Sequence, residues 1–220
     1  MVSISRSCSL HFAQYFLTAH HFPSPRLPPL LPHLPTSRVL ELGSGTGFLG
    51  LALRQIVGHW TFTDQLASLD LVAKNLDRNG VTGGDLQELD WIVEGAPGGP
   101  RGGRGDGAEA AAPDVIVAAD CIYNPSLARP LARTIDACAG AGTVALVASE
   151  LRDAEPLEEF LREWVEGCGW TVARVGEAAE GEGEEAEGEE WSGRMAHAIF
   201  GKEFVVWIGW KAQEGAKGKD

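Results

Sequence analysis

The chain alternates between two spacings of apolar residues. Short, nearly unbroken apolar runs are typical of buried parallel strands, and between them lie segments whose apolar residues recur every three or four positions, as on a helix face. The most continuous apolar runs predict strands over about 114–120, 143–149 and 204–210, and shorter, more mixed segments predict strands over about 38–42, 60–64, 86–90 and 170–175. The other segments predict helices over about 7–19, 47–56, 66–79, 125–138 and 155–166.

Two of these helices have a well-defined apolar face. In the helix over 66–79 this face comprises Leu66, Leu69, Val72, Ala73 and Leu76. In the helix over 155–166 it comprises Leu157, Phe160, Leu161, Trp164 and Val165. We expect both faces to pack against a sheet.

Five alternations of strand and helix predict the fold class, a doubly wound α/β domain with a mostly parallel, seven-stranded sheet. The segment 177–190, between the last two strands, consists of glutamate, glycine and alanine and has no apolar face for a crossover helix. The last strand should therefore pair antiparallel. In open sheets of this kind, ligands bind at the carboxyl ends of the central strands.

Length and composition indicate one main domain. With 220 residues, of which 44% are hydrophobic, the chain can bury one sizeable core. We expect an N-terminal helix and a proline-rich connector over 1–37, the main domain over 38–212, and a tail over 213–220. Two segments, about 95–113 and 177–192, are rich in glycine and in small or charged residues, and we expect them to be disordered insertions.

The net charge of −13 is concentrated in one place, because residues 177–190 contain eight glutamates and no cation. Without those eight charges the chain carries a net charge of −5. Phosphate backbones are bound by clustered lysine and arginine, so this balance argues against nucleic acid as a partner.

Several classes of protein are disfavoured by what the sequence lacks. No apolar run approaches the roughly 20 residues that span a membrane, and the N-terminus lacks the apolar stretch of a secretory signal. The four cysteines, at 8, 121, 138 and 168, are scattered, and together with the histidines they indicate neither a disulfide framework nor a metal site. We expect a cytoplasmic protein, with the nucleus as the other compartment that fits.

A glycine-spaced turn follows the first predicted strand. Residues 39–47 are Val-Leu-Glu-Leu-Gly-Ser-Gly-Thr-Gly, and Asp64 lies seventeen positions after the last glycine, at the end of the second predicted strand. Glycines at such a turn let the backbone approach a ligand closely, and the second-strand carboxylate can accept two ribose hydroxyls. This layout predicts an adenosine-binding site.

Glu41 distinguishes between the ligands that contain adenosine. Dinucleotide sites use Gly-x-Gly-x-x-Gly and place a pyrophosphate at a helix N-terminus. Here the glycines fall at 43, 45 and 47, and Glu41 would repel a pyrophosphate, whereas it suits an amino group and a sulfonium. S-adenosylmethionine is the cofactor that this chemistry favours. The alternative is a plain glycine-rich turn, with Asp64 as an exposed loop acid.

The predicted architecture and the loop Glu41–Gly47 resemble the Rossmann-like, seven-β-strand S-adenosylmethionine methyltransferases. Residues 63–75, the Leu-Asp-Trp sequence at 89–91, and above all residues 119–127 resemble methyltransferase family 16, the protein-lysine methyltransferases. The resemblance covers about residues 38–175 and is nearest to fungal members that act on ribosomal or translation-factor lysines.

The segment 119–127 is Ala-Asp-Cys-Ile-Tyr-Asn-Pro-Ser-Leu, and its Asp-x-x-Tyr pattern is that family's hallmark. The resemblance implies that Asp120 and Tyr123 are catalytic, acting on a substrate amine. It implies a cofactor site formed by Glu41, Gly43, Ser44, Gly45, Gly47, Asp64, Trp91 and Ala119. Within that site Asp64 would bind the ribose hydroxyls, and Trp91 would pack beside the adenine.

Each of these side chains also has a purely structural interpretation. Trp91 could be a core aromatic that closes the end of the sheet, and Tyr123 a half-buried loop aromatic. Asp120 could cap a helix, since aspartate is a favoured N-cap residue.

The resemblance departs from the family pattern near the N-terminus. Family members usually carry a tryptophan at the start of the first helix, where it touches the cofactor, but this chain has no tryptophan before Trp60. Aligning the first helices would place Arg6 or a neighbour there. A shortened N-terminus would explain the difference and would weaken cofactor binding.

The function that these observations favour is methyl transfer from S-adenosylmethionine to a lysine of a protein, by a monomeric enzyme. Small-molecule N-methylation is an alternative, since one fold hosts many functions. Against it, the chain lacks the Asn-Pro-Pro-Tyr sequence used on planar nitrogens. A second alternative is a catalytically silent interaction module that keeps the cofactor fold.

Overall fold

The computed structural model describes residues 8–21, 31, 33–81, 84–95, 112–175 and 204–211. Both predicted insertions and the predicted tail lie outside the described residues, except for the two ends of the first insertion. No helix in the described part of the chain is long and apolar enough to cross a membrane.

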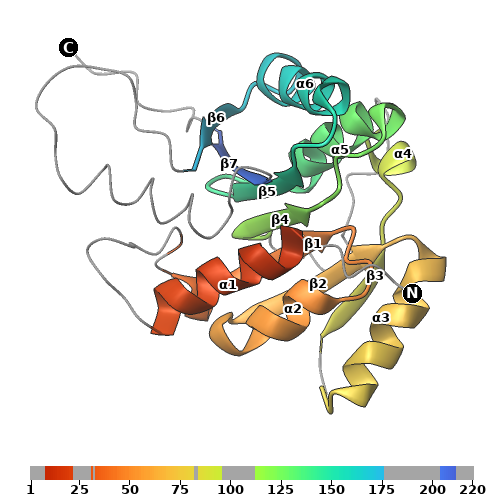
Figure 1. The fold of residues 1–220 in the computed structure, drawn as a ribbon, viewed down its shortest axis with the longest axis vertical. Coiled ribbons are helices and arrows are strands. Elements are labelled where there is room, and N and C mark those ends of the chain that lie inside the picture. The colour runs from red at the N-terminus through yellow and green to blue at the C-terminus, as the bar shows by residue number, and fades with distance from the viewer. Residues whose placement is uncertain are drawn as a thin grey trace, which may run out of the picture.

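The described residues form a seven-stranded sheet with the order β3-β2-β1-β4-β5-β7-β6 (Figure 1). The strands are β1 (Arg38–Leu42), β2 (His59–Asp64), β3 (Asp85–Glu88), β4 (Val115–Ala119), β5 (Val144–Glu150), β6 (Thr171–Arg174) and β7 (Phe204–Trp210). The first five strands pair in parallel, whereas β7 lies antiparallel between β5 and β6. The predicted fold class is confirmed.

Helices cover both faces of this sheet (Figure 1). One face packs against α1 (Cys8–His21), α2 (Phe48–Leu53) and α3 (Leu66–Arg78). The other packs against α4 (Trp91–Glu94), α5 (Pro125–Cys138) and α6 (Ala154–Arg162). Two 3-10 turns, η1 (Leu34–Thr36) and η2 (Arg54–Ile56), and a π-helical turn, η3 (Glu163–Gly167), complete the regular structure that is described.

Strand β4 is buried on both faces, and this burial accounts for its continuous run of apolar residues. Val115 and Val117 belong to the core under α1, α2 and α3, whereas Ile116 and Ala118 belong to the core under α5 and α6. Successive side chains of a strand point to opposite faces, so a strand covered on both faces needs apolar residues at every position.

The structure corrects the sequence prediction at the end of β3. The strand ends at Glu88, and Trp91 is the first residue of a short helix rather than part of a strand end. The Asp90 carboxylate accepts a hydrogen bond of 2.9 Å from the Ile92 backbone N–H and so caps that helix.

Two predicted core residues are exposed. Leu66, the first residue of α3, is 63% exposed, and Val165 is 43% exposed. Val165 lies in the π-helical turn, which shifts the side-chain positions from those of an α-helix. Trp164 is fully buried there, and it packs where Gly209 has no side chain, since a Cβ at Gly209 would lie 2.3 Å from its ring.

The topology places a crevice between β1 and β4. These strands are parallel neighbours, but β1 leads into α2 on one face and β4 leads into α5 on the other. The crevice outside the carboxyl ends of two such strands is the general ligand site of doubly wound sheets.

Candidate functional site

A cavity of about 460 Å³ opens at this crevice, a volume typical of ligand pockets. The predicted site residues that line it are Glu41, Gly43, Ser44, Gly45, Asp64, Trp91, Ala119, Asp120 and Tyr123. The structure thus brings together every predicted site residue except Gly47.

The glycine loop adopts a backbone that requires glycine. Gly43, Gly45 and Gly47 have φ angles of 69°, 55° and 73°, in the left-handed region that side chains disfavour. A Cβ at Gly43 would lie 2.9 Å from the Cys121 sulfur and 3.0 Å from the Trp91 ring, so this glycine is closely packed. A Cβ at Gly45 would approach only the Gly43 oxygen, at 4.0 Å, so Gly45 borders open space in the cavity.

Gly47 has a different position from the other two glycines. It immediately precedes α2 and is buried. A Cβ at this position would lie 2.9 Å from Val72 Cγ1 in α3. The absence of a side chain at Gly47 therefore lets the turn pack against α3, and Gly47 itself does not line the cavity.

The loop is held to β2 and α3 by side-chain hydrogen bonds. The Gly45 backbone N–H donates to Asp64 Oδ2 at 2.8 Å, and the Gln65 N–H donates to Asp64 Oδ1 at 2.8 Å. The Asn75 amide donates to the Thr46 carbonyl, also at 2.8 Å. Asp64 therefore fixes the loop conformation, with both carboxylate oxygens already engaged and further lone pairs at the cavity wall.

Glu41 is a buried acid, with 3% of its surface exposed. Its Oε2 accepts hydrogen bonds from Trp60 Nε1 at 3.0 Å and from the Ser44 hydroxyl at 3.1 Å. Burial raises the pKa of this carboxyl to about 7, although both hydrogen bonds favour the ionised form. A cation in the cavity would favour the ionised form as well.

Trp91 is both a core-packing residue and a lining residue of the cavity. It is partly buried and packs against the core under α5 and α6, and it also lines the cavity. Its ring covers the site where Gly43 lacks a Cβ. The ring therefore packs closely against the glycine loop at Gly43.

Asp120 directly follows β4 and has a φ of 59°, the one non-glycine residue in the left-handed region among the described residues. Its backbone N–H donates to the Ala148 carbonyl of β5 at 2.8 Å, which fixes this unusual conformation. The side chain that caps α5 is Asn124, which accepts from the Ser126 N–H at 3.0 Å. The capping interpretation of Asp120 is therefore wrong, and strained residues of this kind concentrate at functional sites.

Asp120 and Tyr123, which both line the cavity, differ in accessibility. Asp120 is partly buried, and this burial raises the pKa of its carboxyl, whereas Arg152 lowers it and Glu150 raises it further. Tyr123 is 63% exposed while also lining the cavity. Tyr123 is therefore more accessible than Asp120 to a side chain that arrives from solvent.

Several residues of the cavity lie outside the predicted site. The additional lining residues are Ser9, Thr46, Phe48, Leu49, Gln65, Ser68, Leu89, Asp90, Cys121 and Leu127. Most are neighbours of predicted site residues, but Ser9 comes from α1 and had no local signal. It lines the cavity from the start of the first helix. Arg6, which alignment of the first helices would place near the tryptophan position, lies outside the described residues.

The charges around the cavity fit a cationic ligand. Among the described residues that line it, Glu41, Asp64, Asp90 and Asp120 are acids, and none is lysine or arginine. A pyrophosphate would find no cation in this lining, whereas an adenosine that carries an amino group and a sulfonium finds carboxylates and an open glycine. The residues present therefore fit S-adenosylmethionine.

Two curated proteins are similar in sequence to this chain. A diaminohydroxyphosphoribosylamino-pyrimidine deaminase of Schizosaccharomyces pombe is 35% identical over 130 residues, which are 58% of this chain and 30% of that protein. The protein N-lysine methyltransferase METTL21A of Danio rerio is 30% identical over 130 residues, which are 57% of this chain and 55% of that protein. The chain thus spans about a third and about half of the length of these two curated relatives.

A solved S-adenosylmethionine-dependent methyltransferase of Clostridium acetobutylicum shares the fold, with a TM-score of 0.54 and 10% identity over 93% of this chain and 92% of that one. A model of the lysine methyltransferase family matches residues 30–165, more than half of the chain. The chain therefore belongs to the lysine methyltransferase family and has S-adenosylmethionine as its cofactor.

Proposed function

We propose that this chain is a protein-lysine N-methyltransferase. The observation that supports this most directly is the cavity itself, which is lined both by the glycine loop with Asp64 and by Asp120 and Tyr123. We take the first group as its cofactor wall and the second, which follows β4, as its acceptor wall. Bound S-adenosylmethionine would supply an electrophilic methyl group on its sulfonium sulfur. The chain's residues must then bring a neutral amine to that methyl group.

On the cofactor wall, we propose a division of roles among the loop residues. Asp64 would accept the ribose hydroxyls while it holds Gly45, and Gly45 would admit the ligand next to the backbone. Gly43 and Ser44 would contact the methionine portion, and Glu41 would face its amino group. Trp91 would pack beside the adenine, and Ala119 would form the floor.

On the acceptor wall, the residues must bind a substrate amine that is positively charged in solution. A lysine ε-ammonium has a pKa of about 10.4 and must lose a proton before it can attack. Asp120 would hold the ammonium at the strand end and orient the nitrogen once the proton leaves to solvent. Tyr123 would offer its ring face to the cation, worth about 0.5–2 kcal/mol. Holding the amine in line with the methyl group would supply most of the acceleration.

The rim of the cavity supports a protein as the substrate. Phe48 and Tyr123 line the cavity and are 40% and 63% exposed. Leu66 and Ile92, each directly after a lining residue, are 63% and 60% exposed. Exposed apolar side chains of this kind are available to contact a protein that presents its lysine at the cavity. The resemblance to fungal members of the family makes the translation machinery the substrate class that we propose, and the cytoplasm the compartment.

The deamination named for the fission-yeast relative has no support in this cavity. Zinc-dependent nucleobase deaminases use histidine and cysteine ligands. Among the described residues that line the cavity, Cys121 is the only cysteine, and there is no histidine.

The test is to incubate the chain with methyl-labelled S-adenosylmethionine and a cell lysate. A labelled protein, with the methyl group located on lysine by mass spectrometry, is the expected result. Label in a small molecule would instead support small-molecule N-methylation. Absence of label, with cofactor binding intact, would support the silent interaction module.

A further inference from the structure

Three charged side chains meet where β4 and β5 end. Arg152 lies two residues after β5, and its Nη2 is 3.8 Å from Asp120 Oδ2. The same guanidinium nitrogen forms an ion pair with the Glu150 carboxylate. The Arg152 backbone N–H also donates to the Glu150 carbonyl at 3.0 Å, which makes a tight turn at the strand end. Arg152 is therefore held by Glu150 while it faces Asp120.

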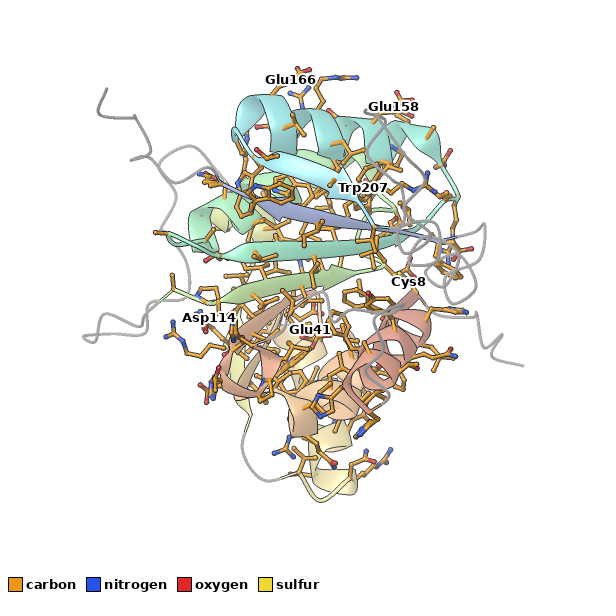
Figure 2. The ribbon with its side chains drawn as sticks, turned by 90° about the vertical axis from the view of Figure 1, so that its left-hand side faces the viewer. Cys8, Glu41, Asp114, Glu158, Glu166 and Trp207 are labelled. Atoms are coloured by element: carbon orange, nitrogen blue, oxygen red, sulfur yellow. The ribbon has the colours of Figure 1, made fainter. Side chains whose placement is uncertain are left out.

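The groups around Asp120 determine how much its charge depends on Arg152. The strained backbone and the hydrogen bond to Ala148 fix where the Asp120 side chain begins. Cys8, at the start of α1 (Figure 2), is buried next to the same three groups, and burial raises the pKa of its thiol to about 12, so it stays neutral. Among the described residues, the charged groups facing Asp120 are thus Arg152 and Glu150, and of these only Arg152 favours the carboxylate over the protonated acid.

We propose that Arg152 is a positioning residue, which keeps the Asp120 carboxylate charged and directed into the cavity. This inference rests on the proposed role of Asp120 in the reaction. The cluster of two carboxylates and one guanidinium has a net charge of −1, so one substrate ammonium would neutralise it. Without Arg152, partial burial and the Glu150 charge would both favour the protonated form of Asp120, which cannot hold an ammonium as an ion pair.

A purely structural ion pair would behave differently. The Arg152 side chain is 51% exposed, and exposed pairs contribute little to stability. Arg129 provides a matched control, because it is 53% exposed and pairs with Glu159 at 2.8 Å, linking α5 to α6. Replacing either arginine should leave the melting temperature nearly unchanged, whereas only Arg152 should affect Asp120.

The first measurement follows the Asp120 carboxyl resonance by NMR during an acid titration of the full chain without cofactor. The resonance is assigned by its absence in Asp120→Asn. The midpoint should rise in Arg152→Ala, stay close to the parent in Arg152→Lys, which keeps the charge, and be unchanged in Arg129→Ala. An identical midpoint in Arg152→Ala and the parent would overturn the proposal.

The second measurement is the pH profile of methyl transfer. Removing the cation raises the Asp120 pKa, so Arg152→Ala should lose about tenfold in kcat/KM at the acidic end of the profile, and less as pH rises. Arg152→Lys should recover much of this loss. A loss that is equal at every pH would overturn the proposal. If Asp120→Ala itself transfers methyl at the parent rate, the proposed function of Asp120 fails, whereas the titration still reports independently on Arg152.

Discussion

The two walls of the cavity are built differently. The cofactor wall is closely cross-linked: the Gly45 N–H is bound by Asp64, the Thr46 carbonyl by Asn75, and Glu41 is buried under two hydrogen bonds. The acceptor wall has a fixed backbone at Asp120 but presents its side chains to solvent. Tyr123 is largely exposed there, and the side chain of Arg152 is half exposed.

This difference suits two kinds of ligand. A cofactor of constant shape is bound best by a preorganised wall, since little ordering then remains to be done on binding. A side chain presented by another protein must enter from solvent, and it needs an accessible charge and an aromatic surface. Changes on the cofactor wall should therefore act on affinity, and changes on the acceptor wall should act on turnover.

The most severe change on the cofactor wall is Gly45→Arg, which should reduce cofactor binding below detection by calorimetry. The arginine side chain would occupy the open space that Gly45 borders in the cavity. Gly80→Arg is the matched control, because Gly80 has a φ of 63° and open space but does not line the cavity. Both variants should bear similar backbone strain, of about 1–3 kcal/mol. Equal cofactor binding by the two variants would remove the basis for placing the ligand at Gly45.

A smaller loss of affinity is expected from Asp64→Ala, which removes an ionised hydrogen-bond acceptor worth about 1.5–3 kcal/mol, or roughly ten- to a hundredfold in Kd. Part of the effect would come from the Gly45 N–H, which loses its partner. Asp64→Asn keeps one oxygen acceptor and should fall between Asp64→Ala and the parent. An unchanged Kd in Asp64→Ala would mean that the carboxylate serves only the loop turn.

The smallest effect should be a pH dependence of binding that Glu41 causes. Its pKa is about 7 in the cofactor-free protein, and a cationic ligand favours the ionised carboxylate. Binding should therefore release a proton below about pH 7, so that affinity falls as the pH falls, by at most about tenfold per pH unit, and is level above. Calorimetry in buffers of different ionisation enthalpy counts this proton. Glu41→Gln should release none; the same proton release in that variant would assign it to another group.

The buried central strand and the glycine turn could be predicted from the sequence, because local patterns of residues determine both. The apolar run of β4 requires a strand buried on both faces, and the glycine spacing after β1 predicts the turn that the φ angles of Gly43 and Gly45 show. The cap of α4 was also present locally, because Asp90 directly precedes Trp91, but the predicted strand over 86–90 included this cap residue.

Features that depend on strand pairing could not be predicted in the same way. Arg152 reaches Asp120 only because β4 and β5 are parallel neighbours whose carboxyl ends lie at the same edge of the sheet. The insertion of β7 between β5 and β6, and the arrival of Ser9 at the cavity, likewise depend on long-range packing. Nothing in the spacing of these residues along the chain specifies such contacts.

The most direct test of the division between the two walls measures cofactor affinity and methyl transfer in the same preparation of Asp120→Ala. The expected result is a Kd for S-adenosylmethionine within a few-fold of the parent, together with a loss of methyl transfer of about a hundredfold. A loss of this size is typical when one partner of a charge pair is removed from a binding site. Tyr123→Ala should show the same separation. Undiminished methyl transfer by Asp120→Ala would contradict the assignment of the acceptor wall.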